Sequence, residues 1–414
     1  MDDSARNDSP AINNQQTTGN TDSISSEEQK TQDNTFAALK TSNAYNESQK
    51  TSSFADDSGN LKPTTSQIQK LDEKIKASTL PKELQDKVVA MVDRLRLIGN
   101  DSSFFIELDS TSRYIDWVTS LPWNNSSKDI LDLAHAQQVL DKNHYGLTDV
   151  KEKILEYLSI MLLKQTRGQT GADSFARAPI ISLVGLAGVG KTTVAFSIAE
   201  SLGRKIERIP FGGMGSASQL RGKTRLFPDA EPGLVIKALK RAGTNNPVIL
   251  LDEIDRVSEE ARSDIMGVLV ELLDPTQNKA FTDHFIDFPV DLSNVLFIAT
   301  SNNTKDISTA VIDRLEVIQM PSYTDEEKTV IGKSFVLSEV LKESGMTPED
   351  LVINDDVWEE SLIRPLGYDP GIRSLQRIIQ GIIRKVAYLQ LLGKLPKGKF
   401  VVTRDNVKQF VSQW

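Results

Sequence analysis

Hydrophobic residues are spread unevenly along the chain, and their spacing changes from one region to the next. Within residues 1–65 the apolar side chains are scattered among Ser, Thr, Asn, Gln and Asp, and Phe36, Tyr45 and Phe54 stand far apart. Such a segment cannot bury enough apolar surface to offset the entropy that is lost on ordering. The pattern therefore predicts a disordered polar tail over residues 1–65.

Residues 66–127 show the three- and four-residue spacing of apolar positions that is typical of amphipathic helices. One helix is predicted after Pro81. A second is predicted to end at Pro122, because a proline disfavours helical backbone in the residue before it. We interpret this range as a helical linker region, in which Trp117 and Trp123 are expected to be core anchors. Two further helices are predicted over 131–140 and 150–163.

Beyond residue 178, short apolar runs alternate with helical segments. This alternation implies an α/β fold, in which a parallel, doubly wound sheet lies between helices over residues 128–324. From residue 325 to 414 the pattern predicts a smaller helical lid domain, with an apolar stripe from Ile372 to Leu389. A short strand over 400–402 and a helix over 404–411 are expected within the lid. The strands predicted for the sheet are 180–184, 206–209, 248–251, 295–299 and 317–320.

Composition narrows the classes of function. The chain has 414 residues and a net charge of −9, which argues against a general nucleic-acid coat because such proteins need a basic face. It has no cysteine, so disulfides, thiolate zinc sites and cysteine nucleophiles are excluded. The first residues are acidic and polar, and no apolar run reaches the ~20 residues of a membrane span. We expect a cytoplasmic protein without a membrane segment.

The strongest chemical signal is the segment from Gly185 to Thr192, which matches G-x-x-x-x-G-K-[ST]. It lies between a predicted strand and a predicted helix, the context in which this pattern forms a phosphate-binding loop. Its glycines let backbone N–H groups point at an anion. Lys191 is expected to reach the β- and γ-phosphates of ATP, and the Thr192 hydroxyl to ligate Mg²⁺. The residues expected to bind nucleotide here are Gly185, Leu186, Ala187, Gly188, Val189, Gly190, Lys191, Thr192 and Thr193.

Polar residues follow other predicted strands at their carboxyl ends, where ligands collect in a doubly wound sheet. Asp252 and Glu253 come directly after an apolar run. We expect Asp252 to hold Mg²⁺ through water and Glu253 to orient the attacking water, because phosphoryl transfer needs positioning and charge neutralisation. Asn302 is either a turn residue or a contact to the γ-phosphate or that water. From spacing alone, Arg314 is either a charge-stabilising residue or part of a surface ion pair.

Together with further segments, these motifs resemble the ATPase module of Lon proteases, a branch of the AAA+ family. The resemblance runs from about residue 68 to the end of the chain. It implies an AAA+ P-loop fold that hydrolyses ATP with Mg²⁺. It also implies a homo-oligomer, a hexameric ring that acts on unfolded or damaged proteins in quality control and ATP-dependent proteolysis. Besides the phosphate loop, the matching segments are 141–147, 211–213, 221–222, 250–255, 273–278, 281, 283–284, 297–302, 312–318, 323–328 and 371–375.

The resemblance also implies roles for single residues. Asn302 would be the first sensor of the nucleotide, and Arg373, on the lid, the second. Arg314 would be an arginine finger that acts on the ATP of the neighbouring subunit, a role worth ~10³–10⁵ in rate. The residues expected to line the adenine pocket are Tyr145, Gly146 and Leu147.

The sequence departs from the family pattern in two places. Lon proteases carry an aromatic–aliphatic pair on a loop that faces the ring pore and grips the substrate. The matching segment here keeps the aromatic as Phe227, but Pro228 and Asp229 replace the aliphatic residue and the glycine. Pro228 stiffens the loop and removes a backbone donor. The Ser–Lys peptidase domain and the N-terminal substrate-binding domain have no counterpart, so we expect no peptide hydrolysis by this chain alone.

Three hypotheses of function follow. The leading one is an ATP-driven protein unfoldase or remodeller, which either works with a separate Ser–Lys peptidase chain or is a truncated product. The second is a non-proteolytic regulatory subunit of a Lon-type ring, motivated by the altered pore loop. The third is a nucleic-acid remodelling ATPase, because such motors share the fold. The net negative charge of the chain argues against the third hypothesis.

Overall fold

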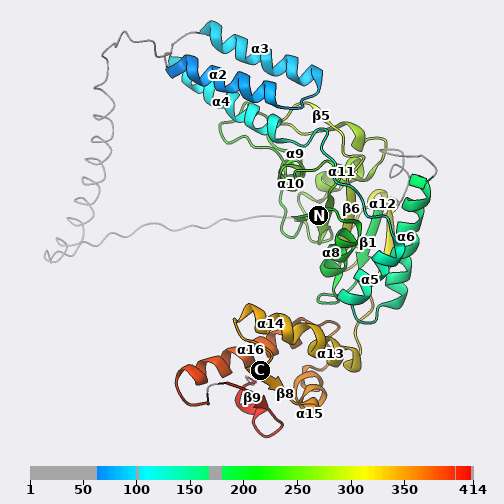
Figure 1. Ribbon diagram of the computed structural model, residues 1–414. Coiled ribbons are helices and arrows are strands. Elements are labelled where there is room, and N and C mark those ends of the chain that lie inside the picture. The colour runs from blue at the N-terminus through cyan, green and yellow to red at the C-terminus, as the bar shows by residue number, and fades with distance from the viewer. Residues whose placement is uncertain (1–62, 99–101, 167–179, 397, 412–414) are drawn as a thin grey trace, which may run out of the picture. The chain divides into compact units, whose positions relative to one another are not determined.

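The computed structural model describes residues 63–98, 102–166, 180–396 and 398–411 (Figure 1). From Pro63 onward the chain forms one compact unit. Of the tail predicted over residues 1–65, positions 1–62 lie outside the described residues, and the described part of the chain starts with a helix at Pro63. The domain limits near residues 127 and 324 remain predictions. Among the described residues, buried apolar side chains gather in three separate clusters.

Three helices at the start of the described chain pack on one another. Helix α3 starts directly after Pro81, and α4 ends shortly before Pro122, as the two prolines predict. Trp123 donates a 2.8 Å hydrogen bond from Nε1 to a carbonyl oxygen of α4, and its ring packs edge-on against Phe288. Trp117 and Trp123 both pack against the first core cluster, in agreement with their expected role as anchors. The bounds are α2 (Pro63–Ala77), α3 (Lys82–Ile98) and α4 (Ser102–Ser120).

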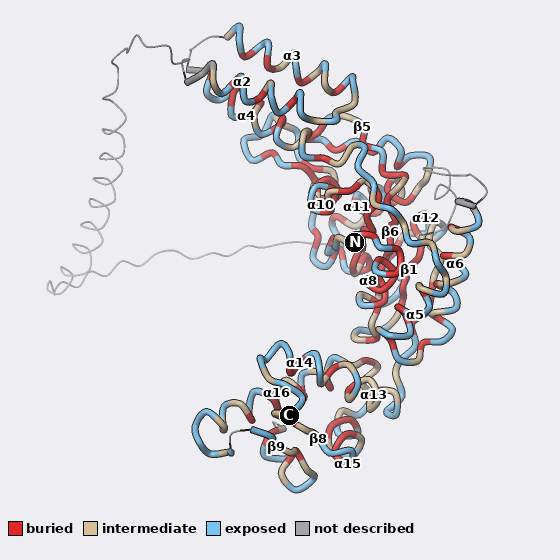
Figure 2. The backbone as a smooth tube through the Cα atoms, viewed as in Figure 1, coloured by how far each residue is buried: buried red, intermediate tan, exposed pale blue. Residues whose placement is uncertain are grey.

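The centre of the molecule is a five-stranded parallel sheet with the strand order β2-β3-β6-β1-β7. The predicted parallel α/β sheet is thereby confirmed. Strands β3 and β6 are buried along their whole length, and β1 and β6 lie in a largely red region of Figure 2. Their continuous apolar runs follow from a parallel sheet that is covered on both faces. The bounds are β1 (Ile180–Val184), β2 (Ile206–Pro210), β3 (Val248–Asp252), β6 (Leu296–Ser301) and β7 (Leu315–Gln319).

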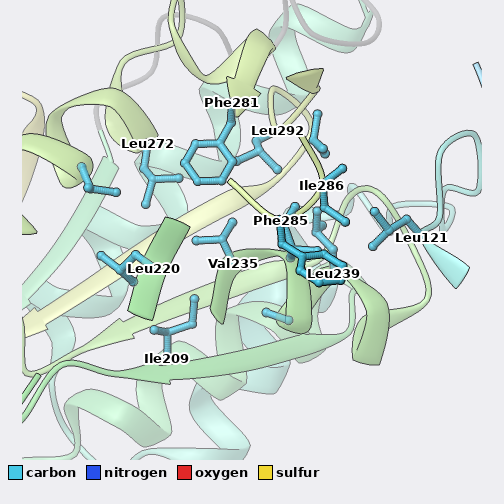
Figure 3. Close-up of a cluster of buried hydrophobic side chains, with 14 of the residues drawn as sticks. Leu121, Ile209, Leu220, Val235, Leu239, Leu272, Phe281, Phe285, Ile286 and Leu292 are labelled. Atoms are coloured by element: carbon cyan, nitrogen blue, oxygen red, sulfur yellow. The ribbon is translucent and has the colours of Figure 1, made fainter. Parts of the chain in front are cut away.

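Successive residues of a strand point to opposite faces of the sheet, so each strand contributes side chains to two separate cores. Ile249 and Leu251 of β3 belong to the first cluster, whereas Val248 and Leu250 belong to the second. The first cluster also includes helices α10 (Leu234–Ala242) and α11 (Arg262–Leu273), and Figure 3 shows part of it. The second includes α5 (Leu133–Asn143), α6 (Thr148–Thr166) and α8 (Lys191–Leu202).

Short elements connect the strands and helices of the sheet region. A two-stranded antiparallel ladder, which the sequence pattern did not indicate, pairs Phe281 with Val290. Phe281, labelled in Figure 3, and Val290 are both buried in the first cluster, so this ladder contributes side chains to that core. The bounds are α9 (Ser218–Arg221), η1 (Asn278–Ala280), β4 (Phe281–Thr282), β5 (Pro289–Val290) and α12 (Thr309–Ile312).

The third cluster draws only on residues beyond 330 and is built around the predicted apolar stripe. That stripe is one face of α16 (Arg373–Leu391), with Leu375, Ile379, Ile382 and Val386 buried. Two of the other helical elements are π-helices, η2 and η3. The bounds are α13 (Asp325–Ile331), η2 (Gly332–Val336), α14 (Leu337–Glu343), β8 (Leu351–Ile353), α15 (Asp355–Val357), η3 (Trp358–Ile363), η4 (Arg364–Leu366), β9 (Phe400–Val402) and η5 (Val407–Gln409).

The predictions near the C-terminus are correct for the strand and wrong for the helix. Strand β9 has the predicted bounds and pairs in parallel with β8, a strand that the pattern did not indicate. In place of the α-helix predicted over 404–411 there is a short 3-10 helix, η5. The Asn406 side chain closes a turn instead, because its Oδ1 accepts from the Thr403 N–H at 2.8 Å and its Nδ2 donates to the Val401 carbonyl at 3.0 Å.

Candidate active site

The loop between β1 and α8 has the backbone of an anion-binding turn. Gly188 and Gly190 have φ of 86° and 91°, a conformation that residues with side chains rarely adopt. At Gly185 the constraint is space, because a Cβ there would lie 2.7 Å from the carbonyl oxygen of Met320. The glycines of the motif are therefore required by the geometry of the loop, as its sequence predicts.

Helix α8 begins at Lys191, and the ammonium group of this residue lies against the preceding loop. Its Nζ donates to the carbonyl oxygens of Gly185 and Leu186 at 2.6 and 2.9 Å, and to Asn302 Oδ1 at 3.0 Å. Burial lowers the pKa of Lys191, while the nearby Asp255 acts in the opposite direction. A bound phosphate would offset this burial with a charge of opposite sign.

Asp252 ends β3 as a buried carboxylate with a donor at each oxygen. Its Oδ2 accepts from Arg208, with Nε at 2.7 Å and Nη2 at 2.6 Å. Its Oδ1 accepts a hydrogen bond from the Thr300 hydroxyl of β6, and the Thr192 hydroxyl lies 3.5 Å from the same oxygen. The two residues predicted to hold Mg²⁺, Thr192 and Asp252, thus lie side by side.

Glu253, the next residue, has a strained backbone. Its φ is 59°, in the left-handed region, which costs a residue with a side chain about 1–3 kcal/mol. Its N–H donates to the Thr300 hydroxyl at 2.9 Å, and its carboxylate lies 3.4 Å from Arg256 Nη1. A Cβ on Gly212 would lie 3.1 Å from Glu253 Oε2, so the carboxylate reaches the segment that follows β2.

Asn302 follows β6 and meets Lys191 through its side-chain oxygen. Its amide nitrogen Nδ2 is buried and has no hydrogen-bond partner among the described residues. A buried donor without a partner is costly unless a ligand or water accepts from it. The main-chain N–H of Asn302 donates to Asp255 Oδ2 at 3.0 Å, so Asp255 fixes this strand end. Asp255 belongs to the matching segment 250–255, but the sequence predicted no role for it.

Arg373 approaches the phosphate loop from the start of α16. A Cβ on Gly188 would lie 3.3 Å from Arg373 Cγ, and the Ile372 N–H donates to the Gly188 carbonyl at 3.0 Å. Gly371 fits against the loop only because it has no side chain, since a Cβ there would lie 2.6 Å from the Ala187 carbonyl oxygen. This close approach of two backbones was not predicted from the sequence.

The residues predicted for the adenine pocket form a tight turn after α5. Gly146 and Leu147 both have positive φ, with values of 64° and 53°, and Leu147 is buried while Tyr145 is exposed. The preceding residue, His144, shares a 2.8 Å hydrogen bond between its Nε2 and Ser197 Oγ of α8. The turn is thus tied to the helix that begins at the phosphate loop.

Arg314 lies away from the phosphate loop of its own chain. It directly precedes β7, at the amino ends of the strands, whereas the phosphate loop follows their carboxyl ends. Its guanidinium donates to Asp274 Oδ2 at 2.9 Å and to the Ala310 carbonyl at 2.7 Å. Hydrogen bonds from Thr276 and the guanidinium of Arg314 hold the pKa of Asp274 well below its usual range. Arg314 therefore forms an ion pair with Asp274, which was one of the two roles that its sequence context predicted.

Phe227 lies in a closed loop between α9 and α10. The Lys223 N–H donates to the Glu231 carbonyl at 3.0 Å, which brings the two ends of the loop together. Leu226 is 92% exposed and Phe227 is 58% exposed. The family pattern places the aliphatic residue after the aromatic one, whereas here Leu226 precedes Phe227. The sequence therefore did not predict a role for Leu226. The loop presents an aliphatic–aromatic pair in reversed order.

The donor set fits Mg²⁺ bound together with a nucleotide. Within the described ranges there is no group of three or more His, Cys, Asp or Glu side chains that could hold a metal ion alone. Mg²⁺ is usually bound by one or two carboxylates together with phosphate oxygens and water. Thr192 and Asp252 supply the adjacent protein oxygens that such a site needs, so the metal would need the phosphates as its remaining ligands.

Comparisons with known proteins agree with this geometry. Residues 181–323 match the family model described as ATPase family associated with various cellular activities (AAA). The chain is 40% identical over 345 residues to the Lon protease of Lawsonia intracellularis, which covers 83% of this chain and 40% of that protein. It is also 40% identical over 324 residues to Lon protease 2 of Thermus thermophilus, covering 78% and 40%. The chain spans about two fifths of the length of these relatives.

The Lon protease of Mycoplasma mycoides subsp. mycoides is 38% identical over 348 residues, covering 84% of this chain and 42% of that protein. The matched region therefore begins well before the AAA segment and includes most of the described chain. In the parts of the chain that the structure describes, no helix is long and apolar enough to cross a membrane.

Proposed function

We propose that this chain, which contains a Lon-family AAA ATPase module, hydrolyses ATP and uses the energy to unfold or remodel proteins. One observation carries this proposal. At the start of α8, Lys191 donates to Asn302, which follows β6, at 3.0 Å, and the Thr192 hydroxyl lies 3.5 Å from Asp252 at the end of β3. Between them they offer a cation, two metal-binding oxygens and an unpaired amide donor.

In this proposal the backbone N–H groups of the phosphate loop and the ammonium of Lys191 bind the β- and γ-phosphates. Thr192 and Asp252 hold Mg²⁺, which when bound neutralises the charge that develops on the phosphates. Glu253 orients and polarises the attacking water. Asn302 donates its free Nδ2–H to the γ-phosphate or to that water. Tyr145, Gly146 and Leu147 line the adenine pocket.

The two arginines would complete the site from different chains. Arg373 approaches the phosphate loop of its own chain, which supports its role as the second sensor. Arg314 lies at the opposite ends of the strands, which supports a role toward the ATP of a neighbouring subunit. A homo-oligomeric ring, hexameric by analogy with the family, would supply that neighbour. Arg314 would exchange the carboxylate of Asp274 for the charge on the transferred phosphoryl group.

We further propose that Leu226 and Phe227 together grip the substrate chain at the ring pore. Their exposure supports this role, because large apolar side chains that stay exposed on a loop often mark an interaction site. The substrates would be unfolded or damaged cytoplasmic proteins, as in protein quality control. A separate Ser–Lys peptidase chain is the partner that would turn unfolding into proteolysis.

The direct test of ATP hydrolysis is Glu253→Gln. This variant should bind ATP as the wild type does, because the amide keeps the size of the side chain, and it should release no phosphate above background. Calorimetry measures binding and a phosphate assay measures turnover. Turnover that is unchanged in this variant would remove Glu253 from the mechanism, and failure of the wild type to bind ATP would remove the proposal itself.

A second candidate function rests on the altered loop. Pro228 and Asp229 stand where the family has an aliphatic residue and a glycine, so the chain would serve as a non-proteolytic regulatory subunit of a Lon-type ring. Mixing the chain with an intact homologue and measuring the composition of the rings tests this. Rings that contain only one of the two chains would rule it out.

A further inference from the structure

Arg208 is a basic residue next to the metal-binding carboxylate that none of the roles above uses. It lies on β2, the edge strand of the sheet, opposite Leu250 of β3. Asp252 is two residues further along β3, so both side chains project from the same face of the sheet. This diagonal placement brings the guanidinium to the end of β3, although the Arg208 side chain itself is 52% exposed.

The contact engages one particular oxygen of Asp252. Both Nε and Nη2 of Arg208 converge on Oδ2, at 2.7 and 2.6 Å. The other oxygen, Oδ1, faces the hydroxyls of Thr300 and Thr192. Because Thr192 is the second predicted metal ligand, Oδ1 is the oxygen on the metal side. The carboxylate therefore has one oxygen committed to the arginine and one turned toward the ion.

We propose that Arg208 is a positioning residue that makes Asp252 bind the ion directly through one oxygen, rather than through water as its sequence context predicts, and so selects Mg²⁺ over Ca²⁺. Mg²⁺ needs near-octahedral geometry and keeps several waters, whereas Ca²⁺ accepts both oxygens of a carboxylate and a larger ligand number. An Asp252 whose Oδ2 is held by a guanidinium offers the ion one carboxylate oxygen instead of two, which favours Mg²⁺ over the larger Ca²⁺ with its greater ligand number. The inference rests on the proposed function, because it concerns the ion that accompanies ATP.

A merely structural ion pair is the competing explanation, and the chain offers a matched control for it. On the same strand, Glu207 accepts from Arg241 Nε of α10 at 2.6 Å. The Arg241 side chain is exposed to a similar extent as that of Arg208, and this ion pair joins β2 to α10 rather than to the end of β3. Loss of the Arg241 pair measures what an ion pair contributes to the strand alone.

The experiment compares Arg208→Gln, Arg208→Lys and Arg241→Gln with the wild type as full chains. Calorimetry measures binding of a non-hydrolysable ATP analogue in EDTA and then in titrations with Mg²⁺ or Ca²⁺. Residues that orient a metal ligand typically change metal affinity 10–100-fold when replaced. We expect Arg208→Gln to raise the half-saturating Mg²⁺ concentration by about 10-fold or more. Binding in EDTA should be unchanged, and the ratio between the Ca²⁺ and Mg²⁺ requirements should shrink.

The lysine variant and the control sharpen the result. Arg208→Lys keeps the charge but loses the planar pair of donors, so its Mg²⁺ requirement should fall between those of the wild type and Arg208→Gln. Arg241→Gln should behave as the wild type. Equal effects of Arg208→Gln and Arg241→Gln, or an unchanged ratio of Ca²⁺ to Mg²⁺ requirement in Arg208→Gln, would overturn the inference. A wild type that binds the analogue and hydrolyses ATP in the same experiments would leave the proposed function standing.

Discussion

Gly371 offers a quantitative test of how closely the lid must approach the phosphate loop. The perturbation is one methyl group, Gly371→Ala. The new Cβ would lie 2.6 Å from the carbonyl oxygen of Ala187 and 2.6 Å from the carbonyl carbon of Gly188, while ordinary contacts of a Cβ begin at 3.4 Å. Both neighbours are backbone atoms of the phosphate loop, so no side chain can rotate away. The lid and the loop must instead separate by about 0.8 Å, the difference between these distances.

The energetic cost follows from two contributions. Insertion of a methyl group into a packed contact costs about 1–3 kcal/mol. The 3.0 Å hydrogen bond from the Ile372 N–H to the Gly188 carbonyl would lengthen beyond the usual limit, which removes about 1 kcal/mol. Each 1.4 kcal/mol is a factor of about ten in affinity. Because the lid can relax outward, we expect the low end of this range, with ATP binding weakened about 10- to 100-fold.

The assay is ATP binding by calorimetry, with thermal unfolding as a check on the fold. Gly381→Ala is the matched control, because Gly381 lies within α16 and a Cβ there would meet nothing within 4 Å. Alanine is the better helix former by about 1 kcal/mol, so this control should bind ATP normally and be at least as stable as the wild type. Normal ATP affinity in Gly371→Ala would refute the reasoning that the lid closes directly onto the loop.

Three further predictions use other parts of the site. Arg314→Gln should bind ATP normally but lose about 10³-fold or more in turnover, which single-turnover kinetics would measure, and normal turnover would contradict a role as arginine finger. Burial lowers the pKa of His144 from 6.5 to about 4. The unfolded chain therefore takes up a proton below pH 6.5 while the native chain does not, and stability falls by about 2 kcal/mol between pH 7 and pH 5. Urea titrations at pH 7 and pH 5 should show this loss in the free energy of unfolding of the wild type and a smaller loss in His144→Asn. An equal loss in both proteins would show that His144 does not cause it. Leu226→Ser should keep basal ATP turnover but reduce unfolding of a fluorescent substrate as much as Phe227→Ser does, and full unfolding activity in Leu226→Ser would limit the grip to Phe227.

The features that the sequence predicted well depend on short stretches of chain. Strand β1 has the predicted bounds, because a run of apolar, β-branched residues ends at a glycine that begins the phosphate loop. The positions of Lys191, Thr192 and Asp252 follow in turn from the strand ends. Once the parallel order of the sheet is known, these side chains must meet at one edge.

The features that it missed depend on residues far apart in the chain. The close fit of Gly371 becomes visible only when the lid lies against Ala187 and Gly188. The engagement of Asp252 by Arg208 requires the pairing of β2 with β3, which joins segments more than 40 residues apart. The helix predicted over 404–411 failed for a local reason, since Asn406 caps a turn and the helical periodicity of so short a segment is weak.

The position of Arg314 has a consequence for how the protein behaves in dilute solution. If the Arg314 guanidinium acts only on the ATP of a neighbouring subunit, an isolated copy can bind ATP but lacks the arginine that hydrolysis needs. Hydrolysis would then be a collective property whose rate per molecule climbs with concentration and levels off once every copy has a neighbour. ATP binding per molecule would not depend on the protein concentration, so the ratio of hydrolysed to bound ATP would report how far assembly has proceeded.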